Sequence, residues 1–293
     1  MLTMSLAPLF SFYFGLTAST DAPMLFALAA ATLCLSHALF DEPHSKPVFW
    51  IAGGFFSGLA ILSKYNALVA LLGFAVFLFT SKRHRKLLLT PMPYLAAAIA
   101  VLVFAPVIIW NAQHDWLSFR FQGARTWSFG FTPFAVVKYL AVQFLFLFPI
   151  PWLATIRAML RAFRLGPASE RTWFLVCPGV LPIIFFTLLR IFPSVHKGYH
   201  WVAPGYLLLC PLAGALVAEL MKHQPRTSLH LWSAVALNAI LFFVVAIDVR
   251  TFWGWDLVPS LAGYDPLISD TVDWTDLAPT FARTDSAAGN RSL

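Results

Sequence analysis

The sequence predicts an all-α polytopic membrane protein with about nine transmembrane helices and a short periplasmic C-terminal tail. Hydrophobic residues make up 59% of the chain and charged residues only 11%, which is far from the composition of soluble domains. Apolar runs long enough to cross a bilayer recur along the chain, and the alternating pattern of membrane β-strands is absent. The Lys and Arg residues gather in alternate connections between these runs.

Nine apolar runs are candidate spans, because a backbone in hydrocarbon must satisfy its own hydrogen bonds as a helix. They are Met1 to Thr17, Ala22 to Phe40, Pro47 to Ser63, Tyr65 to Thr80, Leu87 to Trp110, Phe131 to Thr155, Thr172 to Leu189, Trp201 to Ala218, and Thr227 to Ile247. Residues 1–247 therefore form the predicted transmembrane domain. Residues 248–293 form the tail, whose last part, Thr284 to Leu293, is expected to be disordered.

Positive residues set the expected orientation, since they accumulate on the cytoplasmic side. The basic connections are Ser81 to Lys86, the segment from Arg157 to Arg171, and Lys222 to Arg226. They follow the fourth, sixth and eighth spans and so share one face. The net charge of +7 is thus explained by topology, and no basic stripe indicates a nucleic-acid partner.

Four polar stretches fall on the other face, and Asp21 leads the first of them, Ser19 to Pro23. Asp21 is the only charged residue in the first forty. It could contact a sugar hydroxyl or a divalent ion, but a Thr-Asp-Ala-Pro sequence is also a good helix start with an acid at the N-cap. Both interpretations stay open from the sequence.

Lys64 and Tyr65 interrupt a long apolar region between two predicted spans. A lysine at this depth needs an anion or must extend its ammonium to the membrane surface. We expect Lys64 to bind a phosphate, with extension to the surface as the alternative.

A polar and aromatic shelf runs from Asn111 to Gln122 and is expected to lie flat on the membrane. Asn111 and His114 offer polar groups between two tryptophans, and Arg120 follows on the face where positive charge is disfavoured. An anionic ligand would explain why Arg120 lies on this face. An aromatic belt in contact with lipid headgroups would explain the tryptophans and the polar residues Asn111 and His114.

The stretch His196 to Trp201 opens the eighth span with His196, Lys197 and His200. Such a cation-rich corner suits a phosphate leaving group. A zinc site needs His196 and His200 on one helical face, and Gly198 between them disfavours it.

Together these residues suit a lipid-phosphate substrate whose tail stays in the bilayer. In sugar transfer from a polyprenyl phosphate the leaving group is a stable anion, so cations or a metal matter more than a general acid. The acceptor hydroxyl needs a carboxylate base, and Asp21 is a candidate.

At these residues the chain resembles the bacterial GT-C glycosyltransferases, the polyprenyl-phosphate-sugar family that includes the lipid A aminoarabinose transferase and relatives of protein O-mannosyltransferases. The matching stretches are Ser19 to Pro23, Gly58 to Tyr65, Pro106 to Gln122, His196 to Pro204, and Asp265-Pro266 with Trp274 and Leu277. Family members begin with about two further spans and an acidic outer loop. The resemblance is therefore to an N-terminally truncated member, whose turnover is expected to require the missing piece.

The resemblance implies an inverting transferase of the bacterial inner membrane with a periplasmic active site. The donor would be a polyprenyl-phosphate-linked sugar, and the acceptor lipopolysaccharide, another glycan or a protein. Asp21 matches the family's second acidic residue, which lies near the donor and the place expected for a divalent ion, whereas the acidic motif regarded as the acceptor base belongs to the missing outer loop. Lys64 matches a lysine at the mouth of a span that lines the site. The alternatives are a transporter or lipid-handling protein, in which Asp21, Lys64 and the histidines form a substrate or proton path, and a silent membrane scaffold.

Overall fold

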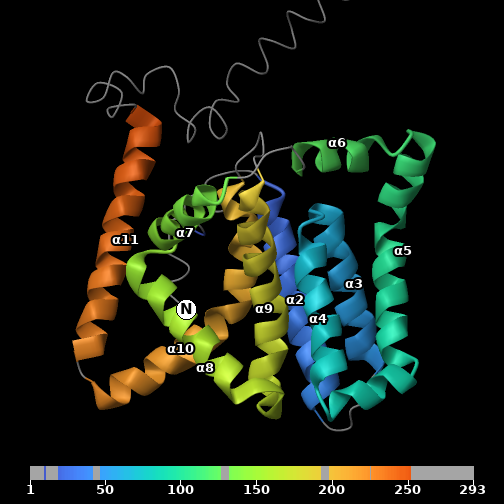
Figure 1. The fold of residues 1–293 in the computed structure, drawn as a ribbon, viewed down its shortest axis with the longest axis horizontal. Helices are drawn as coiled ribbons and strands as arrows, with labels where there is room; N and C mark the ends of the chain where they lie inside the picture. Colours follow the sequence, from blue (N-terminus) through green and yellow to red (C-terminus); the bar gives the residue numbers. More distant parts are fainter. Residues whose placement is uncertain are drawn as a thin grey trace, which may run out of the picture.

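The computed structural model describes residues 10, 19–41, 47–126, 132–192, 198–224 and 226–251, and every regular element in these ranges is helical (Figure 1). The elements are α2 (Asp21–Phe40), α3 (Pro47–Ser63), α4 (Ala67–Thr80), η2 (His84–Leu89), α5 (Met92–Gln113), α6 (Leu117–Thr126), α7 (Phe134–Phe146), α8 (Pro149–Leu165), η3 (Gly166–Ala168), α9 (Glu170–Leu188), η4 (Leu189–Ile191), η5 (Tyr199–Val202), α10 (Ala203–His223) and α11 (Arg226–Thr251). The predicted tail beyond Thr251 lies outside the described residues.

Four described helices are long and apolar enough to cross a membrane: α2, α5, Glu170–Ile191 and Tyr199–His223. Helices α7 and α8 could form a fifth span, bent by 114°. The helices α3 and α4 and the segment Leu231–Ile240 are apolar but shorter. The helical architecture with apolar, membrane-length helices is confirmed for the described residues, whereas the count of nine spans stays a prediction.

The described part of the predicted span from Phe131 to Thr155 is broken into two helices, α7 and α8. Helix α7 ends at Phe146, and Phe148 has a φ of 66°, a left-handed value that a bulky residue rarely adopts. Pro149 then opens α8, where its missing N–H costs no helical hydrogen bond. The chain therefore turns sharply at residues 147 and 148.

A buried polar network lies around this bend. The Gln143 side chain donates to Thr187 Oγ1 at 3.2 Å and accepts from the Tyr206 hydroxyl at 2.5 Å. The Trp152 indole N–H donates in turn to the Tyr206 hydroxyl at 3.0 Å. Because buried polar groups are costly without partners, these bonds tie α7 and α8 to α9 and α10.

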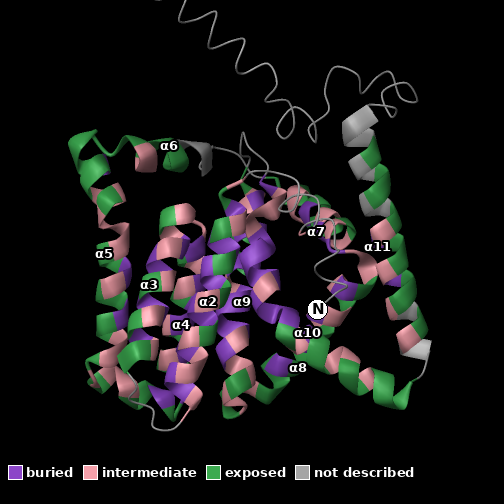
Figure 2. Ribbon diagram, turned by 180° about the vertical axis from the view of Figure 1, so that it is seen from behind, coloured by how far each residue is buried: buried purple, intermediate pink, exposed green. Residues whose placement is uncertain are grey.

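Helices α2, α9 and α10 supply much of the buried core, while α5 and α11 expose most of their surface (Figure 2). Small residues allow the close contacts inside the bundle. A Cβ added to Gly73 of α4 would lie 2.2 Å from the Cα of Pro178 in α9. The backbones of α4 and α9 therefore approach as closely as glycine permits.

The connections divide between the two ends of the bundle as the charge pattern predicts. The connections that hold η2 and η3, and the link from α10 to α11, lie at one end, and we call it the basic end (Figure 1). Helix α6 lies across the opposite end, nearly perpendicular to the bundle helices. The stretch Asn111 to Gln122 is expected to lie flat on the membrane. Its residues from Leu117 onward lie across the spans in α6, whereas Asn111 to Gln113 form the end of α5.

Candidate functional site

Asp21 is the first residue of α2 and is almost completely buried, with 2% of the residue exposed. The Ser19 hydroxyl accepts from the Asp21 backbone N–H at 3.2 Å and donates to Asp21 Oδ2 at 3.2 Å. Thr20, not Asp21, is the N-cap residue, and it makes no side-chain capping bond. The interpretation of Asp21 as an N-cap is therefore wrong, although its charge still lies at the positive end of the helix dipole.

Lys64 lies in the short break between α3 and α4, which places its side chain beside the start of α2. Its backbone N–H still bonds Ala60 O at 3.0 Å, so the end of α3 fixes its position. Its ammonium lies 2.5 Å from Asp21 Oδ2, and the side chain is 21% exposed. Lys64 therefore has a buried anionic partner and is not a lysine that merely extends to the membrane surface.

His200 of η5 completes a cluster with Asp21 and Lys64. Its Nε2 lies 3.1 Å from the Lys64 ammonium and 3.8 Å from Asp21 Oδ2. An ammonium can only donate hydrogen bonds, so with Lys64 charged His200 Nε2 is the acceptor and the ring proton is on Nδ1. Three side chains from distant parts of the sequence thus meet at the end opposite the basic end.

Asp21 Oδ1 is the unsatisfied atom of this cluster. It is buried and has no hydrogen-bond partner among the described residues. A buried acceptor without a donor costs about 1 to 3 kcal/mol. The atom is therefore suited to accept a hydrogen bond from a ligand hydroxyl at this cluster.

Arg190 of η4 is a second cation here, and the sequence analysis did not single it out. It is only 7% exposed. Its guanidinium carbon lies 4.5 Å from the ring centroid of Tyr139 and 5.6 Å from those of Tyr199 and Trp201. Tyr199 directly precedes His200 in η5, which places Arg190 beside the cluster. The available signal was an arginine at the end of a predicted span on the face where positive charge is disfavoured.

The shelf residues Asn111 and His114 do not join the cluster. Asn111 is fully buried, where its amide donates to Val107 O at 2.9 Å and accepts from the Ser118 backbone N–H at 3.1 Å. These bonds fix the corner between α5 and α6. His114 is exposed, stacks on Trp110 with 4.3 Å between centroids, and bonds Trp110 O at 2.7 Å.

Tyr65 connects the cluster to the shelf. Its hydroxyl lies 2.7 Å from Ser118 Oγ on α6, and its ring packs on Phe104 and Phe119. Because Tyr65 follows Lys64 directly, α6 is held beside the cluster by the same turn. Arg120 is exposed on α6.

His196 and Lys197 lie outside the described residues, so the structure places neither of them.

The described residues do not fit a divalent-ion site. Within the described ranges, no group of three or more His, Cys, Asp or Glu side chains is arranged to hold a metal. Near Asp21 the candidate ligands are its own carboxylate and His200, and the Lys64 ammonium already occupies Asp21 Oδ2. A divalent ion on that oxygen would meet a positive charge at short range.

Comparisons with known proteins agree with the resemblance in the sequence. Residues 1–110 match the family described as dolichyl-phosphate-mannose-protein mannosyltransferase. The chain is 30% identical over 204 residues to the lipid A galacturonosyltransferase RgtD of Rhizobium johnstonii. That match covers 68% of this chain and 40% of the relative. No solved structure matches the chain.

Proposed function

The chain belongs to the GT-C membrane glycosyltransferases, and from this membership we propose that it acts in sugar transfer from a polyprenyl-phosphate donor to lipid A. Another glycan or a protein is the alternative acceptor. The activity of the relative, a lipid A galacturonosyltransferase, supports the first choice. The observation that carries the proposal is the convergence of Lys64 and His200 on Asp21, with Arg190 held against the Tyr199 ring beside His200.

The cluster offers what this chemistry needs. In the reaction the bond from the sugar C1 to the phosphate oxygen breaks, and a bond from C1 to the acceptor oxygen forms. Lys64 and Arg190 would stabilise the phosphate that leaves. Asp21 Oδ1 would accept a proton or a hydrogen bond from a hydroxyl, while Asp21 Oδ2 keeps Lys64 in place.

We place the cluster at the periplasmic surface of the bacterial inner membrane. The basic connections lie at the opposite end of the bundle, and positive connections stay on the cytoplasmic side. A donor lipid would then present its phosphate at the cluster while its prenyl chain remains among the helices or in the surrounding bilayer.

The test compares Lys64→Ala with Lys138→Ala in membranes that contain equal amounts of protein. Lys138 is an exposed lysine of α7 and serves as the matched control. We expect Lys64→Ala to lose binding of decaprenyl phosphate and, when the expected N-terminal piece is supplied, sugar transfer to lipid A. Lys138→Ala should keep both. Unchanged binding and transfer in Lys64→Ala would show that the cluster takes no part in the reaction.

The divalent ion expected from the resemblance is tested in the same assay. The described residues give it no complete ligand set, so no step of the proposal depends on it. Transfer that persists in EDTA agrees with this arrangement. Loss of transfer in EDTA, restored by an added divalent ion, would place further ligands outside the described ranges.

A further inference from the structure

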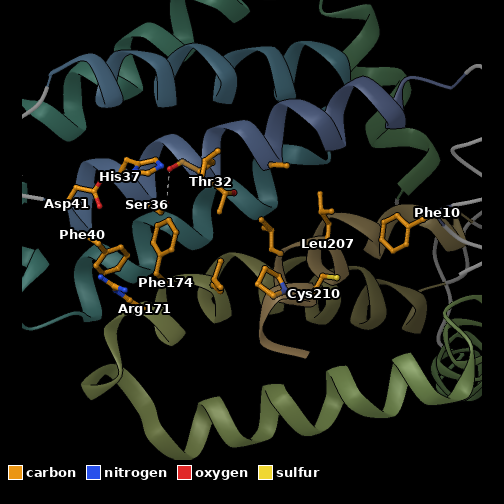
Figure 3. Close-up of a pocket in the computed structure, with 15 residues that line it drawn as sticks. Phe10, Thr32, Ser36, His37, Phe40, Asp41, Arg171, Phe174, Leu207 and Cys210 are labelled. Atoms are coloured by element: carbon orange, nitrogen blue, oxygen red, sulfur yellow. Dashed lines mark hydrogen bonds and ion pairs between the residues drawn. The ribbon is translucent and has the colours of Figure 1, made fainter. Parts of the chain in front are cut away.

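A hollow of about 830 Å³ lies away from the Asp21 cluster, along the half of α2 nearer the basic end. Its walls come from α2, α9 and α10. Figure 3 shows Phe10 at one end of the hollow and His37, Asp41 and Arg171 gathered at the other. Asp21, Lys64, His200 and Arg190 do not line it.

The length and lining of the hollow suit a hydrocarbon chain. From Ala29 to Phe40 along α2 it extends about 17 Å, at about 1.5 Å per residue. One leaflet contributes about half of the roughly 30 Å hydrocarbon core. Most of the wall is apolar and includes Leu175 and Leu207. The hollow therefore matches the depth of one leaflet at the basic end.

Arg171 lies at the end of the hollow near the membrane surface, together with His37 and Asp41. The Arg171 guanidinium lies 5.7 Å from the centroid of the Phe40 ring. It makes no ion pair or hydrogen bond with any residue that the structure describes. A second hollow of about 340 Å³ begins at the same two residues and continues past Arg83 and Ser169. It is more polar than the first and adjoins it.

The neighbouring acids are already engaged. Asp41 Oδ2 lies 2.6 Å from His37 Nδ1. Glu170 lies 3.9 Å from Arg83 and 3.6 Å from His84. Arg171 thus lines both the apolar hollow and the polar hollow. Its guanidinium is placed to bind the anionic group of a ligand at their junction.

We propose that these two hollows form a binding site for an anionic phospholipid of the leaflet at the basic end. One acyl chain lies along α2, and the phosphate contacts Arg171 at the junction of the hollows. Basic pockets between membrane helices on the cytoplasmic side recognise lipid phosphates in this way. The site does not depend on the proposed sugar transfer, because it shares no residue with the Asp21 cluster.

The first test measures which lipids stay with the purified full chain by native mass spectrometry. Phosphatidylglycerol and phosphatidylcholine with the same acyl chains are offered in equal amounts. We expect preferential retention of phosphatidylglycerol, and about a tenfold loss of that preference in Arg171→Gln. Arg164→Gln, which changes an exposed arginine of α8 at the same end, is the matched control and keeps the preference.

The second test addresses the acyl chain. Ala29→Trp places a large side chain in the apolar hollow, whereas Ala97→Trp changes an exposed alanine of α5. We expect only Ala29→Trp to lose the lipid, with both variants folded by circular dichroism. Equal retention of the two lipids in the unaltered protein would overturn the proposal. A dimer that Ala29→Trp separates would also overturn it, since a second copy would then be the occupant.

Discussion

The Lys64 ammonium lies 2.5 Å from Asp21 Oδ2, although 43 residues separate the two in the sequence. The Asp21 side chain is 3% exposed and the Lys64 side chain 21%. The two charges therefore differ in what they lose if their partner is removed. Without Lys64, the Asp21 carboxylate would remain charged and out of contact with water. Without Asp21, the Lys64 ammonium would still contact water.

This asymmetry predicts the order of stability in three variants. Removing one partner of a buried pair typically costs about 3 to 5 kcal/mol, and we expect Lys64→Met to approach that range because it strands Asp21. Asp21→Asn should cost less, since Lys64 keeps access to solvent. The double variant should be more stable than Lys64→Met. Thermal unfolding in detergent checks the order, and a double variant that loses the sum of both single losses would contradict it.

Arg190 gives a prediction that separates affinity from stability. Its charge is held over the rings of Tyr139, Tyr199 and Trp201, and each such contact contributes about 0.5 to 2 kcal/mol. We expect Arg190→Ala to weaken decaprenyl phosphate binding about tenfold and Arg190→Lys to recover part of it. Arg157→Ala, at an exposed residue of α8, should bind normally. If Arg190→Ala lowers the melting temperature without changing the binding constant, the residue has a structural role alone.

The sequence could predict the parts of the site in which a charge interrupts an apolar run. Asp21 and Lys64 are such charges. A charged side chain within an apolar region is expected to pair with a group of opposite charge, so both residues could be selected from the sequence. Arg190 could not be selected in this way, because the aromatic rings that hold its guanidinium come together only in the folded chain. The apolar pattern continues through Phe148, so it did not show that the chain turns there by as much as 114° between α7 and α8. Asn111 has the composition of a headgroup ligand, yet the fold uses its amide within the α5 to α6 corner.

Gly73 provides a test of the close contact between α4 and α9. We expect Gly73→Ala to lower stability by about 1 to 3 kcal/mol, because its Cβ would overlap the Pro178 backbone. Gly214 of α10 has nothing within 4 Å of an added Cβ, so Gly214→Ala should be neutral or stabilising by up to about 1 kcal/mol. Unfolding of both variants in the same detergent gives the comparison. Equal stabilities would mean that the two helices separate readily at this contact.

The bond between Tyr65 and Ser118 predicts a local effect without a global one. The Tyr65 hydroxyl lies 2.7 Å from Ser118 Oγ, and the ring contacts with Phe104 and Phe119 survive its removal. We therefore expect Tyr65→Phe to speed hydrogen exchange in α6 while the melting temperature changes little, since one such bond contributes about 0.5 to 1.5 kcal/mol. Ser118→Ala should give the same exchange pattern, and the double variant should add nothing further because both changes remove one bond. Tyr94→Phe removes an exposed tyrosine hydroxyl that bonds Leu88 O and should leave α6 unchanged. If Tyr65→Phe leaves exchange in α6 unaltered, the ring contacts alone hold α6 beside Lys64.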